Sequence, residues 1–89
     1  MPYIAVVLKE SDDEFSVGFP DLPGCSASGS TLAEARRFAV EAVALHLETL
    51  RAGRHPIPPA RTVDQLRELP AYRHATFIVV DPSLSLASP

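Results

Sequence analysis

Hydrophobic residues fall into four runs along the chain, and the period of each run predicts its secondary structure. Residues 3–8 and 75–80 are apolar at nearly every position, which is typical of strands that are covered on both faces. Residues 15–19 alternate between large apolar and small or polar side chains, as a half-buried strand does. Residues 32–52 repeat their apolar positions with the period of an α-helix, so this stretch predicts one long helix.

Polar and proline-rich segments separate these runs. Residues 9–14 are acidic and polar, and they predict the turn of an antiparallel hairpin. Residues 25–28 predict a short third strand, which Gly29 ends. Residues 54–60 contain too many prolines for a helix or a central strand, so we expect an extended connection there.

The loop of residues 19–25 is the stiffest part of the chain. Its prolines restrict φ, and Pro23-Gly24 predicts the centre of a tight turn in which Gly24 takes a positive φ. Asp21 is the only ionisable group in this loop, and two interpretations are open. The loop is either a structural connector that packs Phe19 inward or a rigid support that presents Asp21 for function.

Capping residues define the two predicted helices. Thr31 and Glu34 form a capping-box pattern before the long helix, and Gly53 predicts a left-handed residue after it. Thr62 and Gln65 form a second capping box, which opens a short helix that ends near Leu69. The predicted buried face of the long helix consists of Leu32, Ala35, Ala39, Ala42, Val43, His46 and Leu50.

These elements predict an α+β domain with the order β-β-β-α-α-β. The strands form a small antiparallel sheet, and the long helix packs on one face of it. Because residues 3–8 and 77–80 are apolar on both sides, the second face needs a cover, either the short helix or a second subunit. A chain this small with such a sheet favours a homo-oligomer. We expect one domain over residues 1–82 and a flexible tail over residues 83–89.

Composition narrows the classes of function. The chain has 89 residues, a formal net charge of −3 and no basic stripe, so direct binding of nucleic acid is not expected. Cys25 is the only cysteine, which excludes an intrachain disulfide and suits a reducing compartment. The sequence shows neither a signal peptide nor an apolar run long enough for a bilayer, so we predict a cytoplasmic protein with no membrane partner.

Few residues offer catalytic or metal-binding chemistry. The acidic set at residues 10–14 lacks the spacing of a calcium loop, and a solvated hairpin tip is the simpler interpretation. His46 has no potential ligand one helical turn away, which favours a buried core histidine. We therefore predict no catalytic, cofactor or metal site. The alternative is a small enzyme or ligand-binding domain that uses Asp21, Cys25 or His46, and it requires these side chains to converge in one pocket.

One pattern of motifs resembles a known family. Residues 3–7 are followed by an acidic turn, by Phe19-Pro20-Asp21-Leu22-Pro23-Gly24-Cys25 and by Ser28-Gly29-Ser30-Thr31-Leu32 with Glu34-Ala35. This pattern is similar to the HicB antitoxin family over about residues 3–60, and the fourth strand extends the similarity to about residue 80.

The resemblance implies a partial RNase H fold and a role as an antitoxin. HicB-like proteins pair with small basic HicA toxins, which cut RNA, and they mask the active site of the toxin. The strands at residues 3–8 and 75–80 carry no carboxylate that would hold a catalytic Mg²⁺, which agrees with an inhibitor that has no enzymatic activity. Many HicB proteins continue into a DNA-binding domain. Residues 83–89 show no such pattern, so we expect no operator binding from this sequence.

Three surfaces are the expected contacts for a toxin. They are the acidic hairpin, the loop around Asp21 and the flank of the long helix between its apolar and polar faces. The candidate contact residues are Glu10, Asp12, Asp13, Glu14, Asp21, Phe38 and Leu45. The helix flank has an alternative interpretation, in which it is part of the buried core and not a contact patch. The protein as a whole also has one, in which it is a homo-oligomer that has no toxin.

Overall fold

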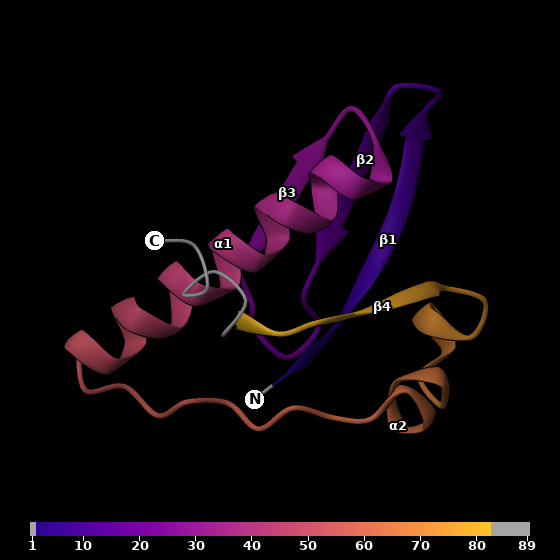
Figure 1. Cartoon of the computed structure of the whole chain (residues 1–89). Coiled ribbons are helices and arrows are strands. Elements are labelled where there is room, and N and C mark those ends of the chain that lie inside the picture. Colours follow the sequence, from indigo (N-terminus) through magenta and orange to yellow (C-terminus); the bar gives the residue numbers. More distant parts are fainter. Residues whose placement is uncertain (1, 83–89) are drawn as a thin grey trace.

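The computed structural model describes residues 2–82, and its elements follow the predicted order. The predicted tail, residues 83–89, lies outside the described residues. The elements are β1 (Tyr3–Ser11), β2 (Glu14–Gly18), β3 (Ser26–Gly29), α1 (Leu32–Ala52), α2 (Val63–Arg67), the 3₁₀ turn η1 (Pro70–Tyr72) and β4 (Thr76–Val80) (Figure 1). The α+β class is confirmed. The 3₁₀ turn was not predicted.

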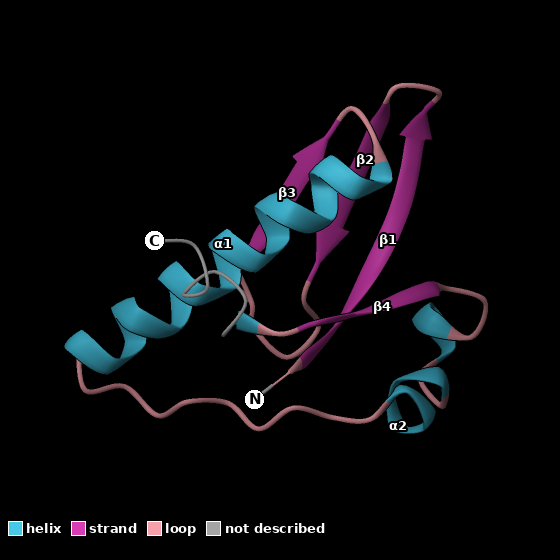
Figure 2. Cartoon of the chain, in the orientation of Figure 1, coloured by secondary structure: helices cyan, strands magenta, loops and turns pink. Residues whose placement is uncertain are grey.

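The four strands form one antiparallel sheet in the order β3-β2-β1-β4 (Figure 2). β1 is central, because Val7 pairs with Val17 of β2 and Ala5 pairs with Ile78 of β4. The hairpin turn is tighter than predicted, since β1 continues to Ser11 and only residues 12–13 form the turn. The side chains of Lys9 and Glu10 therefore belong to a strand, and the ladder with β2 extends close to the turn.

α1 lies on one face of the sheet and packs mainly over β3 and β2. Its buried residues are Ala35, Ala39, Val43 and Leu47, and the small ones let the helix approach closely. A methyl group on Gly29 of β3 would stand 2.6 Å from the backbone nitrogen of Ala35, so this contact requires glycine.

The predicted buried face of the helix was right in part. Leu32 is 42% exposed, and Ala42, His46 and Leu50 are only half-buried, whereas Leu47, which was not predicted, is 2% exposed. The buried residues recur every four positions. Residues four positions apart form a row that is inclined to the helix axis. A helix that crosses the sheet at an angle therefore buries such an inclined row and not a stripe parallel to its axis.

The first turn of α1 is capped by two residues. The Thr31 hydroxyl accepts from the Glu34 amide at 3.0 Å, as predicted. The Glu34 carboxylate, however, accepts from the backbone N–H and the hydroxyl of Ser30 rather than from Thr31. These hydrogen bonds from Ser30 lower the pKa of Glu34, with the backbone N–H as the larger cause.

The predicted left-handed glycine at the end of α1 was also wrong. Gly53 has φ −84°, and Arg54 takes the left-handed conformation with φ 57°. The Arg54 and His55 amides donate to the carbonyls of Arg51 and Leu50, as in a Schellman motif that ends one residue later than predicted. A methyl group on Gly53 would stand 2.7 Å from the ring of the exposed His55, so a larger residue there requires that ring to shift.

The second face of the sheet is covered only in part. The Tyr72 ring packs edge-on against Phe77 with ring centroids 6.5 Å apart, and the Arg67 guanidinium lies 4.7 Å from the centroid of Phe77. Figure 1 shows α2 on the opposite side of the sheet from α1. The predicted cover by the short helix is therefore present at one end, while Leu8 and Val79 remain 58% and 56% exposed.

Candidate functional site

The loop of residues 19–25 consists of two consecutive tight turns. The Leu22 amide donates to the Phe19 carbonyl at 3.1 Å, and the Cys25 amide donates to the Leu22 carbonyl at 3.0 Å. Gly24 has φ 87°, which confirms the predicted turn at Pro23-Gly24. Phe19, Leu22 and Cys25 are buried, so the loop is part of the core as well as a connector.

Asp21 is bonded to a residue that the sequence did not point to. Its two carboxylate oxygens accept from the backbone N–H of Arg61 at 2.7 Å and from the Arg61 Nε at 2.6 Å. The Asp21 side chain is 6% exposed and that of Arg61 is 41% exposed. The aspartate therefore fixes the connection between the two helices against the loop, and its role as a partner contact stays a prediction.

A second contact fastens the same connection. The hydroxyl of Tyr3, which is fully buried at the start of β1, donates to the carbonyl of Pro58. Burial raises the pKa of Tyr3, and the nearby negative charge of Asp21 raises it further. We call residues 54–61 the strap. Its Ile57 and Ala60 also pack against the core, so the strap is held from residue 57 to residue 61.

Cys25 and His46 line one small hollow, but Asp21 does not join them. The hollow has a volume of about 250 Å³ between the start of β3 and α1, and Leu45 and Thr49 also line it. Burial raises the pKa of the Cys25 thiol to about 11, so the thiol stays protonated near neutral pH. The three side chains of the enzymatic alternative do not meet in one pocket, and the group best suited to be a nucleophile is not ionised.

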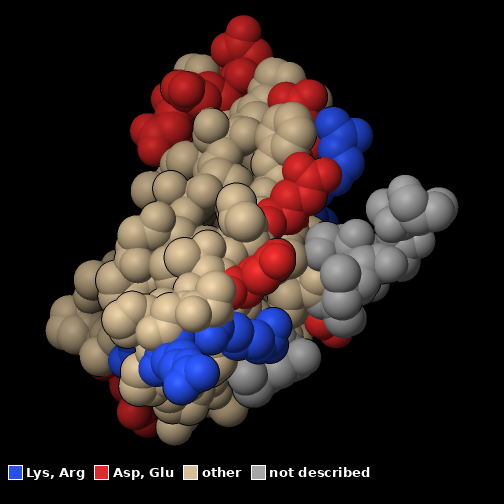
Figure 3. All heavy atoms as spheres, turned by 90° about the vertical axis from the view of Figure 1, so that its left-hand side faces the viewer, with Lys and Arg blue, Asp and Glu red and all other residues tan. Residues whose placement is uncertain are grey.

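The acidic hairpin lies at the other end of the sheet. Glu10, Asp12, Asp13 and Glu14 are all exposed, and Lys9 forms an ion pair with Asp12 at 3.7 Å. Figure 3, which views the molecule from the α1 side, shows acidic side chains gathered at the top, where the β1–β2 turn lies. Basic side chains gather lower in the same view, although one also lies at the upper right and acidic side chains continue down the middle.

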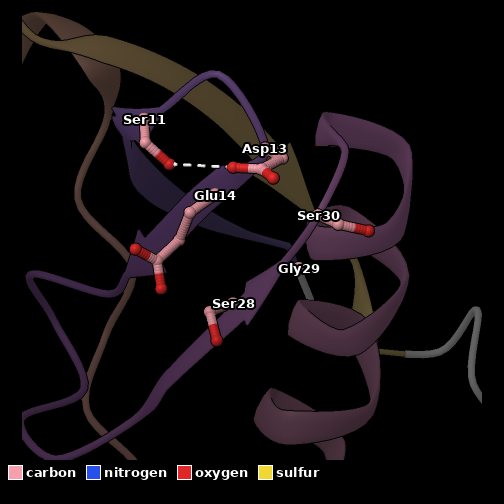
Figure 4. A pocket seen from close by; sticks show the side chains of 6 residues that line it. All are labelled: Ser11, Asp13, Glu14, Ser28, Gly29 and Ser30. Carbon is pink, nitrogen blue, oxygen red and sulfur yellow. Dashed lines mark hydrogen bonds between the residues drawn. The ribbon is translucent and has the colours of Figure 1, made fainter.

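An open hollow separates this hairpin from the turn between β3 and α1 (Figure 4). Its volume is about 370 Å³, and its lining consists of Ser11, Asp13, Glu14, Ser28, Gly29 and Ser30. The Ser11 hydroxyl donates to Asp13 at 3.2 Å. Among the described residues, no three histidine, cysteine or acidic side chains are grouped closely enough to hold a metal ion.

Two exposed apolar side chains mark the flank of α1. Phe38 is 38% exposed and Leu45 is 65% exposed, and the Arg37 guanidinium lies 5.2 Å from the centroid of the Phe38 ring. Residues seven positions apart lie on the same side of a helix, so both belong to one flank. Of the two interpretations of this flank, the structure excludes buried core; contact with a partner stays a prediction.

Sequence reasoning missed the residues that organise the loop. Tyr3, Pro58 and Arg61 were not singled out, although each contacts the loop or the strap. The available signal was Asp21 itself, because a single carboxylate in a rigid apolar loop requires a hydrogen-bonding partner when it is buried.

Over the residues that the structure describes, no helix is long and apolar enough to cross a membrane.

Comparison with known proteins gives consistent matches. The family model of the HicB_like antitoxin of bacterial toxin-antitoxin systems matches residues 3–88. The N-terminal domain of the Burkholderia pseudomallei antitoxin HicB superposes with a TM-score of 0.81 at 29% identity, over 91% of this chain and 96% of that one. A chain of the HicA3 and HicB3 toxin-antitoxin complex gives a TM-score of 0.74 at 28% identity, over the same shares of the two chains.

A curated relative comes from a bacteriophage. An uncharacterised 14.9 kDa protein in the rep-hol intergenic region of Haemophilus phage HP1 is 31% identical over 80 residues, which is 90% of this chain. The chain spans only 60% of the length of that relative.

Proposed function

Because this chain belongs to the HicB-like antitoxin family, we propose that it binds a small HicA-type ribonuclease toxin and masks the active site of that toxin. The observation that carries the proposal is the family match over residues 3–88. It is supported by the similarity of the fold to a chain from a complex of HicA3 with HicB3. The proposed action is cytoplasmic and involves binding alone, with no catalytic step.

The acidic hairpin supplies the charge for this interaction. Its exposed carboxylates at residues 10–14 lie at the end of a rigid strand pair and face solvent. A basic toxin is attracted to such a patch, which accelerates association and favours one orientation. Exposed charges are screened by salt, so this part of the interaction weakens as ionic strength rises.

The α1 flank supplies the apolar contact. Phe38 and Leu45 stand out from a helix that is anchored on the sheet by Ala35 and Leu47. Exposed aromatic and aliphatic groups on a rigid support lose little entropy on binding, and buried side chains of this kind dominate the affinity of protein interfaces.

The loop around Asp21 acts as a support for the proposed interface. Its carboxylate is already bonded to Arg61, so the loop keeps one shape whether or not a partner is present. Any direct contact with the toxin then comes from exposed atoms of the loop, such as those of Pro23, and not from the aspartate oxygens.

The test is binding and inhibition of a HicA-type toxin, to be sought as a small basic protein encoded beside this chain. The wild-type antitoxin is expected to co-purify with that protein and to abolish its cleavage of RNA. Leu45→Asp is expected to weaken the affinity about tenfold or more, since it places a charge in the apolar contact. Leu8→Asp is the matched control, because Leu8 is similarly exposed but lies on the opposite face of the sheet.

Two results would contradict the proposal. One is a neighbouring basic protein that does not bind the wild-type chain. The other is full ribonuclease activity in a purified complex, which would leave binding in place but exclude masking. Equal loss of affinity in the Leu45 and Leu8 variants would show that the α1 flank is not the specific contact.

A further inference from the structure

The exposed side of α1 carries an apolar row and an acidic row beside each other. Phe38 and Leu45 form the apolar row, and seven residues of helix, about 10.5 Å, separate them. Glu41 precedes Leu45 by four positions and Glu48 follows it by three, and both glutamates are exposed. Residues at these spacings are neighbours on a helix surface, so the Leu45 side chain stands beside two carboxylates.

These two carboxylates have no partner within residues 2–82. Neither takes part in an ion pair or a hydrogen bond there, although Arg37 and Arg51 lie one helical turn from them. The Arg37 guanidinium lies instead over the Phe38 ring. In Figure 3, acidic side chains continue from the hairpin down the middle of this side of the molecule. The apolar row is therefore bordered by negative charge that is free to attract a basic partner.

A hollow opens on the other side of Leu45, between α1 and the start of β3. Ala42 and Thr49 line it from the helix, and Cys25, which is 5% exposed, lines it from the loop. Its volume of about 250 Å³ is below the range of about 300–1,000 Å³ that is usual for small-molecule pockets. This size fits one apolar side chain of a partner. We call the hollow together with Phe38 and Leu45 the α1 groove.

We infer that the α1 groove binds a basic amphipathic helix of the partner. An apolar side chain of that helix enters the hollow, and lysine or arginine side chains on its flank lie opposite Glu41 and Glu48. Helices dock in apolar grooves through anchors at i, i+3, i+4 and i+7, and an acidic border selects a basic helix. This binding mode rests on the proposed function, because the helix belongs to the toxin.

A helix fits the α1 groove better than an extended segment does. The separation of about 10.5 Å between Phe38 and Leu45 equals the rise over seven residues of a second helix that lies nearly parallel to α1. Side chains on one face of a strand recur about every 6.7 Å, so a strand along α1 does not match this separation. The spacing of the apolar row therefore favours a helix with apolar residues seven positions apart.

A synthetic helical peptide tests this binding mode on the whole chain. The peptide has about 18 residues, which is long enough for an alanine-rich helix, with leucines seven positions apart. Lysines stand four positions before and three positions after each leucine. In NMR titrations, this peptide is expected to shift the amide signals of residues 24–26 and 38–49 in a saturable way. A peptide of the same composition in scrambled order, and one with glutamate in place of lysine, are expected not to do so.

A pair of charge-reversal variants tests the acidic border. The double variant Glu41→Lys and Glu48→Lys is expected to weaken the affinity for the peptide more than about tenfold, because it places like charges opposite each other. The matched control is Asp12→Lys with Asp13→Lys, which changes the net charge equally but lies in the hairpin turn. Because salt screens distant exposed charges, this control is expected to weaken the affinity less than about twofold.

A pair of tryptophan variants tests the hollow. Thr49→Trp fills the hollow from an exposed position of α1, so it is expected to weaken the affinity about tenfold without disturbing the core. Ala33→Trp is the matched control, because Ala33 is also exposed but lies nearly opposite Thr49 around the helix. The control is expected to bind the peptide as the wild type does.

Failure of this binding mode and failure of the proposed function give different results. A peptide that shifts no signals of the α1 groove, or shifts them no more than its scrambled control, would overturn the binding mode. So would a toxin that binds the wild-type chain and both α1 groove variants equally well, and that result would leave the proposed function standing. A toxin that does not bind the wild-type chain contradicts the proposed function, whereas the peptide still decides whether the groove takes a basic helix.

Discussion

The two ends of the sheet use the same kind of side chain for opposite purposes. At the hairpin end, the turn between β1 and β2, four carboxylates face solvent, and the Asp12 side chain is fully exposed. At the loop end, formed by residues 19–25 and the strap, the Asp21 side chain is 6% exposed and accepts two hydrogen bonds from Arg61. The hairpin end is exposed to solvent and charged. The loop end is largely buried, and its segments are joined by hydrogen bonds.

The difference shows that residues distant in the sequence decide whether a carboxylate is buried and paired or exposed to solvent. Arg61 lies 40 positions from Asp21 in the sequence, whereas the hairpin carboxylates meet only near neighbours such as Lys9 and Ser11. A buried charge is tolerated when it is paired and hydrogen-bonded, and an exposed charge contributes little to stability. We therefore expect mutations at the loop end to change stability and those at the hairpin end to change association.

The largest expected effect concerns Cys25, whose reactivity measures how well the loop end is shielded from solvent. Its pKa of about 11 leaves roughly one thiolate in a thousand at pH 8, against about one in four for a free thiol. Alkylation by iodoacetamide at pH 8 is expected to be about 100-fold slower in the folded protein than in urea. Mass spectrometry of the modified fraction over time measures both rates. Similar rates in the folded and unfolded protein would contradict the shielding of Cys25 from solvent.

The same thiol predicts how stability depends on pH. Because the pKa of folded Cys25 is raised, the folded state holds the proton more tightly than the unfolded chain does. This contribution is fully present below the unfolded pKa of about 8.5 and is lost as the pH rises through about 11. Urea denaturation at pH 8 and at pH 10.5 checks the sign, and Cys25→Ala is expected to flatten this dependence.

Asp21→Ala is expected to lower the free energy of unfolding by about 2 kcal/mol, because it leaves two donors of Arg61 without their acceptor. Urea denaturation measures the change. Asp13→Ala is the matched control at the hairpin end and is expected to change stability by less than about 0.5 kcal/mol. If the two variants lose the same stability, the contrast between the two ends is not real.

Tyr3→Phe removes only the hydroxyl that bonds to the carbonyl of Pro58, and its expected cost is about 1 kcal/mol. The strap is then less firmly held, so the amides of residues 57–61 are expected to exchange faster with solvent. Tyr72→Phe serves as the control. The Tyr72 ring packs on Phe77, and its hydroxyl has no hydrogen bond among the described residues. An equal loss of stability in both variants would count against the Tyr3 contact.

Neutralising the hairpin is expected to have the smallest effect on stability. We consider a variant with Glu10 and Glu14 changed to Gln, and Asp12 and Asp13 changed to Asn. Its free energy of unfolding is expected to lie within about 0.5 kcal/mol of that of the wild type. Its affinity for a basic partner is expected to depend less on salt. Titrations at two ionic strengths measure this dependence, and an unchanged dependence would remove the hairpin from the proposed interface.

Much of the fold could be predicted because its signals are local. The branched run of residues 76–80 specified a strand, and Pro23-Gly24 specified a turn. Thr62 and Gln65 capped the short helix in the way the sequence predicted. Each of these signals depends on a few neighbouring residues, so tertiary packing had little to override.

The contacts that organise the loop end could not be predicted, because they join residues far apart in the sequence. Nothing near Asp21 specifies Arg61, and nothing near Tyr3 specifies Pro58. The helix face failed for a related reason. The choice of Leu47 over His46 depends on the angle at which α1 crosses the sheet, which a helical period does not contain.

The position of β4 beside β1 sets an order for folding during synthesis. β1 is complete once residue 11 has been made, but the strand that pairs with its other side is not complete until residue 80. At about 5–20 residues per second, roughly 3–14 seconds separate the two events. During that interval the central strand of the finished sheet is an unpaired edge. A nascent chain therefore exposes one side of the apolar strand β1 for that interval, and chaperones that bind extended apolar segments have that time to act.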